Sequence, residues 1–97
     1  MDLRQKVADA AVAELRVQLH TDDVEQLGTS VHAGGMFRMV GVAEAIIRAA
    51  LDASNRRLVE EVARSIGGHE WQSYLSQAED AILGARGGLL AQLDPLP

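Results

Sequence analysis

The sequence contains no cysteine and very few aromatic residues. The absence of cysteine excludes disulfides, thiolate catalysis and cysteine-ligated metal sites, and it is typical of a cytoplasmic protein. Phe37, Trp71 and Tyr74 are the only aromatic residues, whereas alanine occurs 15 times. Alanine fills little volume, while aromatic side chains bury the most area. We therefore expect a thin core between closely packed helices.

Long apolar runs and excess positive charge are also missing. No stretch reaches the ~18 apolar residues of a membrane span, since the most apolar segment, residues 39–51, includes Glu44 and Arg48. The first ten residues lack the basic-then-apolar pattern of a signal peptide. The net charge of −5 disfavours binding to the phosphates of nucleic acids. We expect an acidic, cytoplasmic protein that binds neither membrane nor nucleic acid.

Sequence motifs for catalysis are absent. His20, His32 and His69 lack the spacing of metal ligands. There is no Gly-x-Ser-x-Gly motif for a nucleophilic serine and no phosphate-binding Gly-x-x-x-x-Gly-Lys motif. We predict no catalytic residue, metal or cofactor.

The middle third carries two rows of residues spaced by four. One row alternates in charge and consists of Glu44, Arg48, Asp52, Arg56, Glu60 and Arg64. The other is apolar except for one serine and consists of Val42, Ile46, Ala50, Ser54, Leu58, Val62 and Ile66. An offset of two residues places the rows on nearly opposite sides of a helix. This pattern predicts a long central helix over residues 36–66.

The fold class that follows is all-α, with residues 1–97 as a single domain and a bundle of three to four helices. Rows spaced by four interlock when helices cross obliquely, at about −50°. We expect a first helix over residues 2–20, a short helix beginning near Asp22–Glu25, and a last helix that starts near residue 69 and frays or kinks at residues 84–88. Residues 29–35 fit either a loop or a helix. The central helix would span ~46 Å, so it protrudes towards a partner or bends, at Gly41 or at Ser54–Asn55.

A strip of small residues spaced by four, Gly41, Ala45, Ala49 and Ala53, favours a close helix contact. The predicted interface combines this strip with the apolar row and two aromatic residues: Gly41, Val42, Ala45, Ile46, Ala49, Ala53, Leu58, Val62, Ile66, Trp71 and Tyr74. Small residues at spacing four let two backbones approach closely. The contact is either within the chain or between two copies. We expect a protein–protein interaction module that forms a homo-oligomer or binds another protein.

Two other functions remain open at this point. A glycine-rich turn before a helix can hold a small anion through backbone N–H groups. His32, Gly34, Gly35 and Arg38 are the candidate ligand-binding residues. The other alternative is an enzyme whose site forms at an oligomer interface, from histidines and carboxylates of different chains.

Overall fold

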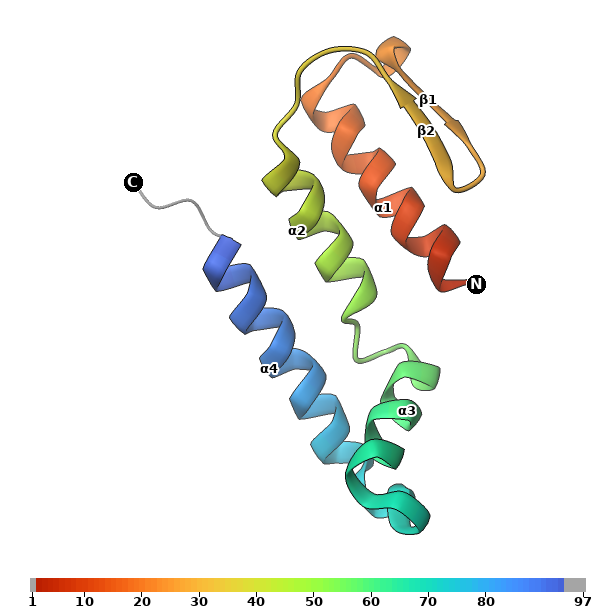
Figure 1. The fold of residues 1–97 in the computed structure, drawn as a ribbon, viewed down its shortest axis with the longest axis vertical. Helices are drawn as coiled ribbons and strands as arrows, with labels where there is room; N and C mark the ends of the chain where they lie inside the picture. Colours follow the sequence, from red (N-terminus) through yellow and green to blue (C-terminus); the bar gives the residue numbers. More distant parts are fainter. Residues whose placement is uncertain (1, 94–97) are drawn as a thin grey trace. The chain divides into compact units, whose positions relative to one another are not determined.

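The computed structural model describes residues 2–93, and most of them are helical (Figure 1), which confirms the all-α prediction. The chain forms two compact units, the first ending at Ala50 and the second beginning at Leu51; the single-domain organisation stays a prediction. The first unit contains α1 (Leu3–Gln18), η1 (Thr21–Asp23), β1 (Val24–Leu27), β2 (Ser30–Ala33) and α2 (Met39–Ala50). The second contains α3 (Arg56–Gly67), η2 (Gly68–Tyr74) and α4 (Leu75–Leu93).

The core of the first unit forms between α1, α2 and one strand. Asp2 caps α1, its side chain accepting a hydrogen bond from the Arg4 backbone N–H at 3.2 Å. Four of the described residues are buried here: Val12, Leu15, Val24 and Val42. Two of them come from α1, one from β1 and one from α2, so α1 contributes half of the buried residues.

A β-hairpin stands where we predicted a short helix near Asp22–Glu25, so that prediction is wrong. Asp22 belongs to a single 3-10 turn, and an antiparallel pair of strands follows in which Val24 lies opposite Ala33. Gly28 opens the two-residue loop with φ +63°, a value that suits the first position of a type II′ turn. Val24 packs in the core, whereas Glu25 is exposed. The strands are four residues long, too short for their alternation to stand out in the sequence.

The predicted helix over residues 36–66 is also wrong as a single element, because α2 and α3 are separate helices. Residues 36–38 precede α2, and residues 51–55 separate it from α3. Asp52 Oδ1 accepts hydrogen bonds from the backbone N–H and the hydroxyl of Ser54, at 2.9 and 2.8 Å. Asn55 then caps α3 by accepting from the Leu58 N–H at 3.2 Å. These local bonds compete with helix continuation, at the Ser54–Asn55 pair where a bend was one expectation.

In the second unit, α3 and α4 form a helical hairpin with its own core. Its buried residues are Val59, Ala63, Ala78 and Ile82. The buried row of α3 is therefore shifted by one residue from the predicted row, whose members Leu58 and Val62 are half-buried. The helix neither frays nor kinks at residues 84–88 as predicted, since α4 is one helix to Leu93. No helix within residues 2–93 is long and apolar enough to cross a membrane.

Two glycines shape the turn after α3. Gly68 has φ +57°, and its N–H bonds to the Arg64 carbonyl, which ends the helix. Gly67 lies against the Tyr74 ring, so closely that a Cβ at this position would overlap the ring. The turn therefore needs glycine at position 68 for the backbone and at position 67 for packing.

We expect Gly67→Ala to destabilise the protein by roughly 1–3 kcal/mol, the usual cost of forcing extra volume into a packed site. Gly84→Ala is the matched control, since nothing lies within 4 Å of a Cβ there and alanine favours an exposed helix by up to about 1 kcal/mol. Urea unfolding of both variants measures the difference. Equal stabilities would contradict the packing of Gly67 on Tyr74.

Candidate interaction surface

The predicted interface residues of α2 lie mainly against α1 of the same unit. Val42 is buried in the core, and Ile46 packs beside it. Gly41 faces α1, because a Cβ there would lie 2.7 Å from Gln18 Nε2. Part of the small-residue strip therefore seats a helix of the same chain.

The predicted residues of the second unit are also largely used within it. Four of them are half-buried and pack on the core of that unit: Leu58, Val62, Trp71 and Tyr74. The Arg64 guanidinium lies 4.7 Å from the centre of the Trp71 ring, a cation–π contact. Ala53 lies in the segment between α2 and α3, and Ile66 remains 47% exposed. The role of these residues as an interface stays a prediction, and the buried residues of α3, Val59 and Ala63, were not among them.

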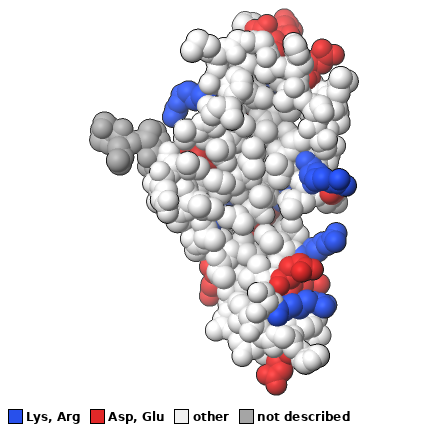
Figure 2. Space-filling view, viewed as in Figure 1, with Lys and Arg blue, Asp and Glu red and all other residues white. Residues whose placement is uncertain are grey.

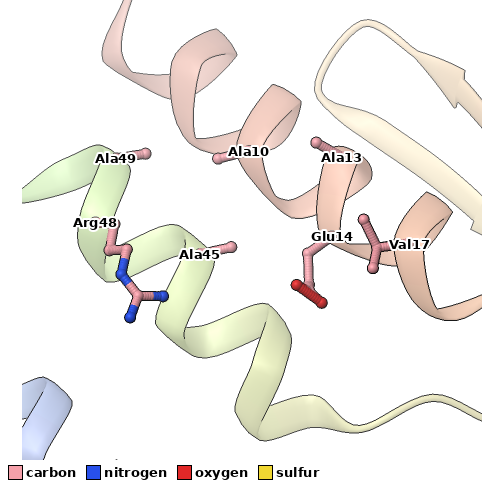
Figure 3. A pocket seen from close by; sticks show the side chains of 7 residues that line it. All are labelled: Ala10, Ala13, Glu14, Val17, Ala45, Arg48 and Ala49. Carbon is pink, nitrogen blue, oxygen red and sulfur yellow. The ribbon is translucent and has the colours of Figure 1, made fainter.

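The two remaining members of the strip, Ala45 and Ala49, line an open hollow between α1 and α2 (Figure 3). On the other side, α1 contributes Ala10, Ala13 and Val17, and the volume is about 480 Å³. Val17 is 80% exposed. We call these residues, with Glu14 and Arg48, the α1–α2 hollow. The sequence predicted its α2 side; the spacing of Ala10, Ala13 and Val17 at three and four was the missed signal for the α1 side.

The hollow carries one acidic and one basic side chain. Arg48 pairs with Glu44 of α2 at 3.7 Å. Glu14 accepts a hydrogen bond from Gln18 Nε2 at 3.2 Å, and no residue within 2–93 forms an ion pair with it. The surface is thus largely apolar, and its half-buried carboxylate, Glu14, forms no ion pair because Arg48 is paired with Glu44.

The alternating charges of the middle third do not form one continuous ridge. Glu44 and Arg48 pair on α2, but Arg56 bonds to Glu79 of α4 at 3.2 Å. Figure 2 shows acidic and basic side chains next to one another over α3. Exposed pairs of this kind are worth ~0–1 kcal/mol each, so they stabilise the helices only weakly.

The candidate anion site is surrounded by acidic groups. His32 and Gly34 border a hollow of about 170 Å³ together with three carboxylates, those of Asp22, Asp23 and Glu25. Such charges repel an anion. Two of the backbone donors are already used, because the Gly34 N–H bonds to the Asp23 carbonyl at 2.8 Å and the Arg38 N–H bonds to Gln18 Oε1. Gly35 has φ +118°, a backbone conformation that favours glycine, so this residue is explained by the path of the chain.

Gln18 and a polar cluster hold the parts of the first unit together. Gln18 Nε2 also donates to the Arg38 carbonyl at 3.1 Å, which fixes the start of α2 on α1. Asp9 Oδ1 accepts from Gln26 of β1 at 2.7 Å and from Gln5 of α1 at 2.8 Å. The side chains of Gln5 and Gln26 also donate to the Gly28 carbonyl, at 3.1 and 2.9 Å. The hairpin is therefore bonded to α1 through amides that depend on one carboxylate.

Neither the arrangement of possible metal ligands nor the comparison with known proteins assigns a function to this surface. Among residues 2–93, no group of three or more histidine and carboxylate side chains has an arrangement that could hold a metal ion. Comparison of the chain with protein families, curated proteins and solved structures gave no match. The function is therefore argued from the surface itself.

The hydrogen bonds from Gln26 and Gln5 lower the pKa of Asp9 below its usual value of 3.8. A carboxyl group whose pKa is lower in the folded state stabilises the fold above its unfolded pKa. That stabilisation is lost as the pH falls through the folded value. We expect the Asp9 carboxyl to titrate below pH 3.8 in carbon-detected NMR, and Asp9→Asn to remove this part of the acid sensitivity of the hairpin.

Hydrogen exchange of the β1–β2 amides at neutral pH gives the second measurement. Protection should fall in Gln26→Ala, which removes one donor to Asp9. Glu25→Ala, on the exposed face of the same strand, is the control and should leave protection unchanged. An ordinary or raised pKa for Asp9 would contradict the cluster.

Proposed function

We propose that this protein is a small helical assembly module that works by binding protein, first of all a second copy of itself. It has no catalytic reaction of its own in this proposal. The α1–α2 hollow is the binding surface.

The observation that carries the proposal is Val17, an aliphatic side chain exposed to 80% beside an open hollow with four alanines. Covering such a surface is favourable by about 25 cal/mol per Å² of apolar area removed from water. Alanines leave the two backbones close to the surface, so an approaching helix gains many close contacts. Open apolar surfaces with few charges are typical of protein–protein contact sites.

The thinness of the two cores supports the same proposal. Within residues 2–93 each unit buries only four residues, and the largest fully buried side chains are valines. Small domains with little buried apolar area are often stabilised by association with another copy. A partner that covers the hollow would therefore contribute to stability as well as to assembly.

Light scattering after size-exclusion chromatography, over micromolar concentrations, tests the proposal. We expect a mass above that of the monomer, and we expect Val17→Lys to shift the protein to monomer, because a long charged side chain replaces the apolar contact and loses its hydration when the surface is covered. Met36→Lys is the control, since Met36 is 96% exposed outside the hollow. It should leave the mass unchanged.

A monomeric wild-type protein at these concentrations would refute self-association. An oligomer that Val17→Lys leaves intact would move the contact away from the hollow. Circular dichroism of both variants shows whether the helices are retained.

A further inference from the structure

The C-terminal half of α4, residues 83–93, has no share in the buried core of its own unit. The helix has 19 residues and α3 has 12, about 28 Å against 18 Å. The two buried residues of α4, Ala78 and Ile82, both lie in its first half. Leu83 is 50% exposed and Leu89 is 44% exposed. This half of α4 thus presents leucines that its own helical hairpin leaves uncovered.

One charge lies on this half of the helix, that of Arg86. It forms no ion pair with any residue of the described chain. Leu83 and Leu90 are three residues before it and four after it, so all three side chains lie on one face of the helix. Gly87, next to Arg86, adds no side chain and allows close approach.

This face of α4 complements the α1–α2 hollow. Neither Glu14 nor Arg86 forms an ion pair among residues 2–93, whereas Arg48, the basic residue of the hollow, is already paired with Glu44 at 3.7 Å. Ala10 to Val17 and Leu83 to Leu90 are each a separation of seven residues, ~10 Å along a helix. The leucines of α4 would fit between the alanine side chains of the hollow, and the positive charge of Arg86 would attract the negative charge of Glu14.

We propose that residues 83–93 of one copy lie in the α1–α2 hollow of a second copy, with Arg86 against Glu14, and that the second copy returns the same contact. Two identical contacts related by a two-fold axis close the dimer. This inference rests on the proposed self-association and names the second half of its interface.

Charge reversal provides a selective test. Glu14→Lys places two positive charges at each contact, and Arg86→Glu places two negative ones. Each variant alone should dimerise at least tenfold more weakly than wild type, because the repulsion acts at both contacts.

Mixing the two variants should restore the dimer. In a dimer with one chain of each variant, the two substituted side chains meet at one contact with opposite charges. The other contact keeps the original pair of Glu14 and Arg86. An equimolar mixture should therefore recover dimer affinity, as should the double variant E14K/R86E.

Matched controls separate this contact from a general effect of charge. Arg57→Glu and Glu61→Lys make the same reversals on the exposed side of α3, and dimerisation should be unchanged. A monomeric wild type would refute both this inference and the proposed function. A dimer that tolerates the single reversals, or single variants that mixing does not rescue, would refute only the reciprocal contact.

Cross-linking gives a readout that does not depend on charge. The chain has no cysteine, so a disulfide can form only between introduced thiols. Mixed chains carrying Ala13→Cys and Gly87→Cys should oxidise to a covalent dimer, because Ala13 and Gly87 flank Glu14 and Arg86. Met36→Cys mixed with Gly87→Cys should not. Equal cross-linking in both mixtures would refute the contact.

Discussion

The shortage of large apolar side chains is the constraint on which the rest of this structure depends. Each core has four buried residues among those described, and two of the four in the second unit are alanines. With so little volume to fill, the helices must approach closely, and glycine occurs at two of the closest points. Gly41 lies against Gln18 and Glu14, and Gly67 lies against the Tyr74 ring. Close approach thus replaces side-chain bulk as the source of packing contacts.

Polar side chains do much of the positioning that a larger core would do. Gln18 holds both backbone groups of Arg38, which sets the start of α2. Gln5, Asp9 and Gln26 hold the hairpin on α1. Such bonds add only ~0.5–1.5 kcal/mol each on balance. They are directional, however, and apolar contacts are not, so they define where each element begins and which way it faces.

The sequence predicted an all-α fold but not where one helix ends and the next begins, and the reason is physical. Rows spaced by four indicate helix wherever they occur, and α2 and α3 are indeed helices. The sequence pattern does not reveal that α2 ends before Asp52, because Asp52 fits the row of alternating charges. In the structure its side chain bonds to Ser54 in the segment that follows α2. The same side chain is thus compatible with a helix surface and with a turn. The buried face of α3 also differs from the prediction, since the buried Val59 and Ala63 each lie one position after a member of the predicted apolar row.

The predicted site illustrates the same difficulty in three dimensions. A strip of small residues indicates a close contact, and Gly41 makes one, but with α1 of its own chain. Only Ala45 and Ala49 remain in an open hollow, together with residues of α1 that no short-range pattern connects to them. The anion site was proposed from local glycines, and the carboxylates around His32 became visible only when the hairpin brought Glu25 opposite it.

The small side chains that leave the cores thin also leave the hollow open, since an alanine-lined pair of helices cannot close its own groove. A third helix is the natural filler of such a groove, because its larger side chains supply the missing volume. The chain carries one helix, α4, that is longer than its own partner α3 and ends in leucines. The same sequence thus contains an open groove that lacks large side chains and a helix with leucines that its own unit does not bury, on either side of the segment at residues 51–55. The proposed self-association therefore follows from this composition as well as from the exposed side chain of Val17.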